Sequence, residues 1–153
     1  MISGAWLMHA VAWFLPATRG RQGLEINTVV SGWEAFLVAA WSIFPHDGRP
    51  FDVPFRRLLI ALSILSTILF IFASPWIVWR APRRFQRASA WAAVAAFTIN
   101  VQWYVISLSE NPGLSIGYFL WWWSFALLAI GLFDLSRQRS GGYSLVQDRL
   151  GNI

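Results

Sequence analysis

One predicted helix, residues 88–108, carries polar and aromatic residues at a spacing that suits small-molecule binding. Asn100, Trp103, Tyr104 and Ser107 fall on one face of an α-helix. An amide in such an apolar helix needs a partner, because an unpaired amide costs several kcal/mol in hydrocarbon. Two interpretations stay open: this face lines a pocket for a lipid, quinone, pigment or peptide, or Asn100 bonds to a neighbouring helix.

Three consecutive tryptophans, Trp121, Trp122 and Trp123, offer aromatic walls for the same pocket. They lie about 10 to 14 Å along a helix that starts at Leu114. Successive residues turn by about 100°, so the three cannot all face lipid, and at least one points into the protein or toward a partner.

Glu34 stands at the start of the apolar run 33–44. Ser31 precedes it by three residues, which is the spacing of a capping box, and a negative charge in the first turn also suits the helix dipole. Glu34 is therefore predicted to be a helix cap first, and a ligand contact only if this helix lies on the external side near Asn100. The candidate ligand-binding residues are Glu34, Asn100, Trp103, Tyr104, Trp121 and Trp122.

His9 is an ionisable ring within the apolar segment 4–17, a position that often has a function in membrane helices. Ala5 lies four residues before it and Trp13 four residues after it. The Ala-x-x-x-His spacing resembles the core of bacterial light-harvesting polypeptides, in which that histidine ligates bacteriochlorophyll. The resemblance implies that His9 is an axial pigment ligand; the alternative is a hydrogen-bonded packing histidine.

Enzyme motifs are missing from the sequence, which has no GxSxG, no HExxH and no Gly-rich phosphate loop. With no cysteine and two histidines, the chain is not expected to build a metal site. We expect a protein that is not an enzyme. The basic run at 80–87 lies between predicted membrane helices, where arginines mark a cytoplasmic loop more often than a nucleic-acid contact.

The elements that position these residues are predicted to be membrane helices. The chain is 57% hydrophobic and 12% charged, whereas soluble domains have about 25% charged residues. Runs at 57–79, 88–108 and 114–135 reach the roughly 20 residues that a bilayer requires, and 4–17 is marginal. Residues 33–44 rise only about 18 Å. The prediction is an all-α polytopic membrane helix bundle with four transmembrane helices plus one short re-entrant or interfacial helix, or with five spans.

Arginine placement predicts the topology. With loop 80–87 in the cytoplasm, the polar C-terminal tail 136–153 is cytoplasmic too, and residues 1–135 form the membrane bundle. The N-terminus is inside if 33–44 re-enters and outside if it spans. We expect a multi-pass protein of a bacterial inner membrane.

Small residues predict where helices approach closely, and they recur on the last predicted span. The preceding predicted helix offers a matching alanine face. Packing within this hairpin and packing against another subunit are both open. The small residues are Gly113, Gly117, Ser124 and Gly131, opposite Ala88, Ala92, Ala95 and Ala96.

Four short segments resemble a loose group of small bacterial inner-membrane proteins with Leu-Pro, Gly-Trp-Glu and Gly-Tyr-x-Leu-Trp signatures. They are "FLPA" (14–17), "SGWEAF" (31–36), "FASPW" (72–76) and "GYFLWWWSFALLA" (117–129). The resemblance implies four spans and no particular reaction. Ser74-Pro75 departs from the Asn-Pro that is commoner in that group.

The surplus of tryptophan, the small-residue face and the missing catalytic motifs favour a role in interaction. We expect an accessory or structural subunit of a larger inner-membrane complex, photosynthetic or respiratory. Its partners would be the lipid bilayer and other integral membrane subunits, with no nucleic acid. The alternative is a binding protein for a lipid, quinone or pigment in an outer-leaflet pocket.

Overall fold

The computed structural model describes residues 1–22, 25–41, 43–44, 54–110 and 113–150. Helices make up most of this part of the chain, as predicted, and a small sheet accompanies them. The helices are α1 (Ile2–Phe14), α2 (Gly32–Trp41), α3 (Pro54–Arg80), α4 (Arg83–Glu110) and α5 (Ile116–Leu150), and the strands are β1 (Pro16–Gln22), β2 (Glu25–Ser31) and β3 (Gly113–Leu114).

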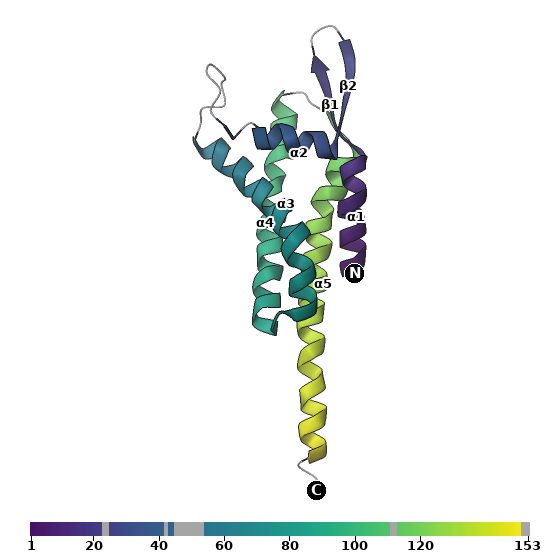
Figure 1. Ribbon diagram of the computed structural model, residues 1–153, viewed down its shortest axis with the longest axis vertical. Helices are drawn as coiled ribbons and strands as arrows, with labels where there is room; N and C mark the ends of the chain where they lie inside the picture. The colour runs from purple at the N-terminus through teal and green to yellow at the C-terminus, as the bar shows by residue number, and fades with distance from the viewer. Residues whose placement is uncertain (23–24, 42, 45–53, 111–112, 151–153) are drawn as a thin grey trace.

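Helices α1, α3, α4 and α5 run along the long axis of the molecule, with α3 tilted, whereas α2 lies across one end of them (Figure 1). The β1–β2 hairpin projects from that same end, and α5 extends beyond the other helices at the opposite end. A transverse α2 does not run beside the long helices as a fifth span would. Its placement matches the interfacial alternative for residues 33–44.

Two helices of the described chain are long and apolar enough to cross a membrane, Arg57–Arg80 within α3 and Ile116–Gln138 within α5. Helix α1 is apolar but has only 13 residues. Helix α4 has 28 residues, but Thr98, Asn100 and Gln102 interrupt its apolar run. The prediction of four spans is therefore supported for two helices only, because α1 is too short and α4 too polar.

The sheet has the order β2-β1-β3, and both pairings are antiparallel. Pro16 pairs with Ser31 at one end of the hairpin, and Thr18 pairs with Leu114 of β3. The sheet thus ties the end of α1 to the start of α5. The prediction contained helices alone and missed these strands, although β2 holds the β-branched residues Ile26, Thr28, Val29 and Val30, which favour strands.

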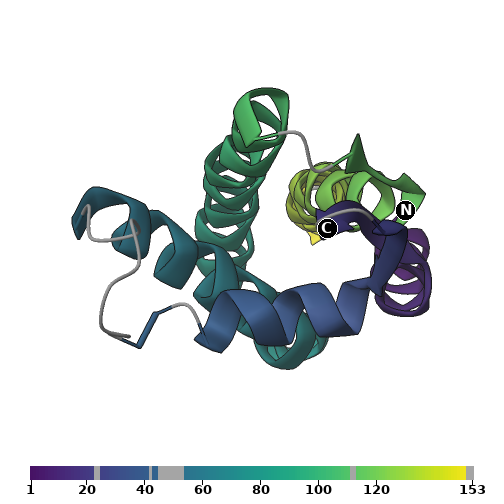
Figure 2. The same cartoon turned by 90° about the horizontal axis from the view of Figure 1, so that it is seen from above.

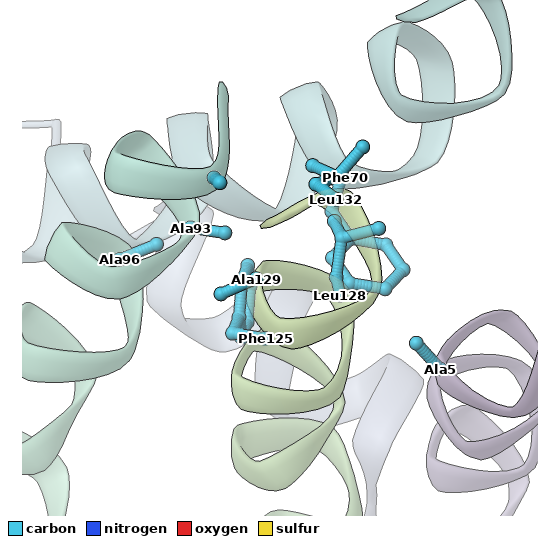
Figure 3. Close-up of a cluster of buried hydrophobic side chains, with 9 residues drawn as sticks. Ala5, Phe70, Ala93, Ala96, Phe125, Leu128, Ala129 and Leu132 are labelled. Carbon is cyan, nitrogen blue, oxygen red and sulfur yellow. The ribbon is translucent and has the colours of Figure 1, made fainter. Parts of the chain in front are cut away.

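Buried hydrophobic side chains from four helices meet in one core (Figure 3). Helix α5 supplies the largest share, and alanines of α4 allow close approach. The buried alanines of α4 are Ala90, Ala93 and Ala96, whereas the predicted Ala88, Ala92 and Ala95 are exposed. The contact face was therefore predicted with the wrong register. The core residues are Ala5, Phe70, Ala90, Ala93, Ala96, Phe125, Leu128, Ala129 and Leu132.

The small residues of α5 pack within the chain, but their partners are α1 and the two residues that follow it, not α4. A Cβ at Gly117 would lie 2.7 Å from the carbonyl oxygen of Pro16, and one at Gly131 would lie 2.5 Å from Cγ1 of Ile2. Ser124 bonds to His9 of α1. At Gly113 an added Cβ meets nothing within 4 Å, so this glycine is not part of the packing face.

The predicted polar tail 136–153 is not separated from the bundle by a break in secondary structure, because α5 continues unbroken to Leu150. Its last part extends past the other helices (Figure 1). The arginine run 80–87, predicted as a loop, is mostly helical: α3 ends at Arg80, α4 begins at Arg83, and only Ala81 and Pro82 form the tight turn between them.

Candidate ligand-binding cavity

A cavity of about 330 Å³ lies beneath α2, where all five helices and the sheet contribute lining residues. Viewed from above, α2 runs from the α1 side of the molecule to the α3 side (Figure 2). Its volume is at the small end of the range for ligand pockets, about 300 to 1,000 Å³. Helix α2 therefore acts as a cover over a space between the upright helices.

Most of the cavity wall is apolar. Helix α2 turns Ala35 and Phe36 toward it, α3 contributes Ile60 and Ile64, and α5 contributes Trp121. The start of α2 is fixed closely on α1, because an added Cβ at Gly32 would clash with the carbonyl oxygen of Ala12. This close approach holds the cover in place.

A polar strip interrupts the apolar wall, formed by Ser63 and Thr67 of α3, Trp103 of α4 and Tyr118 of α5, and two further hydroxyl residues, Thr18 of β1 and Ser107 of α4, line the cavity outside this strip. Asn100 lies behind the strip, fully buried. Its Oδ1 accepts a hydrogen bond from Ser63 (2.5 Å), and its carbonyl oxygen accepts one from the Tyr118 hydroxyl (2.7 Å). The interhelical hydrogen bond considered for Asn100 is therefore present, and Asn100 does not itself line the cavity.

Of the six residues predicted to bind a ligand, Trp103 and Trp121 line the cavity. Tyr104 is 41% exposed on the outer surface of α4. Trp122 packs on α4 instead, where its Nε1 donates to the Phe97 carbonyl at 2.7 Å and its ring stacks on Phe97. The structure brings only part of the predicted set together.

The three consecutive tryptophans point in different directions, because successive residues of a helix are turned by about 100°. Trp121 faces the cavity, Trp122 faces α4, and Trp123 is exposed. The expectation that at least one of the three points inward is confirmed.

Glu34 forms the predicted capping box with Ser31. The Ser31 amide donates to the Glu34 carboxylate at 2.8 Å, the Ser31 hydroxyl donates to it at 2.9 Å, and the Glu34 amide donates to Ser31 Oγ at 3.4 Å. These bonds lower the pKa of Glu34, with the backbone bond the larger cause. The side chain is exposed and is not among the cavity-lining residues.

His9 is buried between aromatic rings, stacked on Phe70 with ring centroids 4.0 Å apart. Its Nδ1 lies 2.9 Å from Ser124 Oγ, and the Ser124 hydroxyl donates to the Trp121 carbonyl at 2.6 Å. Because that hydroxyl has one hydrogen, Ser124 accepts from His9, and the proton resides on Nδ1. This is the hydrogen-bonded packing histidine considered as the alternative to a pigment ligand.

The other ring nitrogen of His9, Nε2, is buried and has no hydrogen-bond partner among the described residues. The ring borders an apolar groove of about 380 Å³ between α1 and α3, together with Trp6, Trp13 and Pro75. A flat pigment macrocycle has no direct approach to an atom below the protein surface. Pigment ligation therefore needs side chains to move, and it stays a prediction that an absorption spectrum of the purified protein tests.

Three residues of the polar strip were missing from the prediction: Ser63, Thr67 and Tyr118. A signal for the first two was present in the sequence, because Ser63, Thr67 and Ser74 recur at helical spacing through an apolar helix. Ser63, Thr67 and Ser74 are all buried. Small hydroxyl residues on one face of a membrane helix indicate contacts with other helices, and here Ser63 and Thr67 also reach a cavity.

Fold and site together define a small, mostly helical protein with two helices of membrane-spanning length and an apolar cavity under a transverse helix. Comparison of the chain with protein-family models, curated proteins and solved structures finds no match. The resemblances drawn from the sequence motifs therefore remain predictions. No group of three or more histidine, aspartate or glutamate side chains suited to a metal ion occurs among the described residues.

Proposed function

We propose that this protein binds a lipid-soluble small molecule in the cavity beneath α2. The observation that carries the proposal is the cavity itself, a largely apolar space of about 330 Å³ with one polar strip in its wall. Ligand pockets commonly combine these features, an apolar lining and a few placed polar groups.

The physical setting favours an apolar occupant. Side chains that face an empty space lose dispersion contacts, so an occupant of matching shape stabilises the protein. Two helices are long and apolar enough to lie in a bilayer, and there lipid-soluble molecules are the abundant candidates. We propose a bacterial inner membrane as that setting, with the arginine turn at 80–87 in the cytoplasm.

A cavity-filling substitution tests the proposal. Ala35→Phe adds a ring to the side of α2 that lines the cavity, and Ala40→Phe adds the same ring to α2 at a residue outside the lining. After purification in a mild detergent, native mass spectrometry is expected to show a bound small molecule on the wild-type chain and on Ala40→Phe, but not on Ala35→Phe.

A wild-type chain free of any bound molecule, which also takes up no added lipid, quinone or pigment, would overturn the proposal. Retention of the bound molecule on Ala35→Phe would place the ligand elsewhere. Circular dichroism on each variant establishes that the helices are intact.

A second candidate function is that of an accessory or structural subunit of a larger membrane complex. The part of α5 that extends beyond the other helices favours it (Figure 1). Its support from the small-residue face is weaker than expected, because α1 occupies that face. Blue-native electrophoresis tests this role, and migration as a lone monomer at every detergent strength would contradict it.

A further inference from the structure

We infer that the molecule held in the cavity is a long-chain alcohol, an apolar chain that ends in a hydroxyl group. This inference rests on the proposed function and names the ligand class. It follows from the direction of each hydrogen bond in the polar strip.

Two hydroxyl groups of the strip point their hydrogens away from the cavity. The Tyr118 hydroxyl lies 2.7 Å from the carbonyl oxygen of Asn100, and the Thr67 hydroxyl lies 3.1 Å from the carbonyl oxygen of Ser63. A carbonyl oxygen only accepts hydrogen bonds, so both hydroxyl groups must donate. Their single hydrogens are used within the protein.

The direction of the hydrogen bond between Ser63 and Asn100 follows from the bonds of Ser66. Ser66 donates its hydroxyl hydrogen to the Ser63 carbonyl at 2.7 Å, so the atom of Asn100 that lies 3.3 Å from Ser66 Oγ must be the amide nitrogen. The amide oxygen of Asn100 then faces Ser63, which donates to it.

The indole N–H of Trp103 is also used, because it donates to Ser63 Oγ at 3.1 Å. All four members of the polar strip have therefore given their hydrogens to protein atoms. The three hydroxyl groups still offer lone pairs, since a hydroxyl oxygen accepts up to two hydrogen bonds, and only Ser63 already accepts one, from Trp103.

A ligand that fits this strip must supply its own hydrogen. An ether or carbonyl oxygen would place its lone pairs against those of Thr67 and Tyr118. An ammonium group would bring an unpaired charge into an apolar space, which is costly, and Glu34 is not among the lining residues. A neutral hydroxyl at the end of an apolar chain supplies the hydrogen and brings no charge into the cavity.

The test compares three probes with the same chain: dodecanol, dodecyl methyl ether and dodecyl methyl ketone. The purified full chain is mixed with equal amounts of the three, and native mass spectrometry reads the ratio of bound species. We expect the alcohol to bind about fivefold more tightly than the ether, as one neutral hydrogen bond provides.

Thr67→Val removes a hydrogen-bond acceptor from the wall with little change of shape, and it is expected to abolish the preference for the alcohol while ether binding stays unchanged. Thr98→Val is the matched control, because Thr98 is exposed on α4 and bonds to its own helix. If Thr67→Val does not fold, Tyr118→Phe removes a second hydroxyl of the same strip.

Equal binding of alcohol and ether would overturn the inference and leave the proposed function standing. Tightest binding of the ketone would overturn it as well, and would place the polar end of the ligand at the Trp121 indole, whose N–H has no described acceptor. If none of the three probes binds, the inference is overturned, and the proposed function is then decided by its own test with the wild-type chain, Ala35→Phe and Ala40→Phe.

Discussion

At the scale of single residues, the contact of His9 with Ser124 shows how α1 is fixed to α5. The serine accepts from the imidazole and donates to its own helix, so one small side chain satisfies two polar groups in an apolar interface. Gly117 lies seven residues before Ser124, and Gly131 lies seven residues after it. Having no side chain, both glycines let the backbone of α5 come close to the N-terminal segment of the chain. This face of α5 thus packs against α1 and against the two residues that follow it.

A methyl group at Gly117 is expected to disturb this contact. Gly117→Ala would place Cβ 2.7 and 2.8 Å from the carbonyl oxygens of Pro16 and Leu15. These are backbone atoms, so the helices must shift, and we expect a loss of about 1 to 3 kcal/mol in the free energy of unfolding. Unfolding by increasing sodium dodecyl sulfate, followed by circular dichroism, measures it.

Gly4→Ala is the matched control, because Gly4 is also helical and an added Cβ meets nothing within 4 Å. Alanine has the better helix propensity, so this variant is expected to be unchanged or more stable by up to about 1 kcal/mol. Equal stability of the two variants would show that Leu15 and Pro16 do not pack on Gly117.

At the scale of elements, sequence patterns predicted the contacts within one segment better than they predicted which helices pack against each other. The capping box of α2, the bonding of Asn100 to another helix and the splitting of the tryptophan run depend on spacing within one segment. The partner of the small-residue face of α5 depends instead on which helix the fold places beside it. A two-residue strand, β3, ties α1 to α5 through β1, and nothing in the helical period of either helix indicates it.

The same reasoning applies to the cavity. Trp103 and Trp121 were predictable because large aromatic residues at a helical spacing suit a binding wall. The position of α2 over the cavity was not predictable, because it depends on the direction that α2 takes after the β1–β2 hairpin (Figure 1). That direction is set by the contact of Gly32 with α1, and it appears only in three dimensions.

Acid is expected to loosen the start of α2. Hydrogen bonds from Ser31 lower the pKa of Glu34 below its ordinary value of 4.5. A lowered pKa in the folded state means that the cap contributes its full stability above pH 4.5, and that this contribution is lost as the pH falls through the lower, folded-state pKa. The protection factors of the α2 amide hydrogens, which compare each exchange rate with that of an unfolded chain at the same pH, should therefore fall at acid pH.

Glu34→Gln is the control for this pH effect. Glutamine also completes a capping box, but it does not titrate. Hydrogen exchange followed by mass spectrometry should show α2 protection that falls with acid in the wild-type chain and stays more nearly constant in the variant. The same acid response in both would assign it to another group.

At the scale of the whole molecule, the two ends differ in kind. The hairpin, α2 and the cavity gather at one end, and the arginine turn between α3 and α4 lies away from them, toward the end where α5 extends (Figure 1). Large apolar side chains are exposed along the helices between these ends, among them Leu65, Phe72 and Val105. Such a band is what a membrane would cover.

Single-cysteine labelling tests this arrangement, and the chain suits it because it has no cysteine of its own. Val29→Cys places a thiol on the hairpin and Pro82→Cys places one in the arginine turn. In intact cells without their outer membrane, a membrane-impermeant maleimide is expected to label Val29→Cys. Pro82→Cys should react only after the membrane is opened, because arginine-rich turns stay in the cytoplasm.

Phe72→Cys separates membrane cover from simple exposure. Phe72 is 76% exposed, more than the 52% of Val29, so exposure alone predicts that it reacts faster. If lipid covers the band, this thiol is expected to stay unlabelled in both preparations. Rapid labelling of Phe72→Cys would show that water reaches the middle of α3, and reaction of Val29→Cys and Pro82→Cys from the same side would contradict the proposed placement across the membrane.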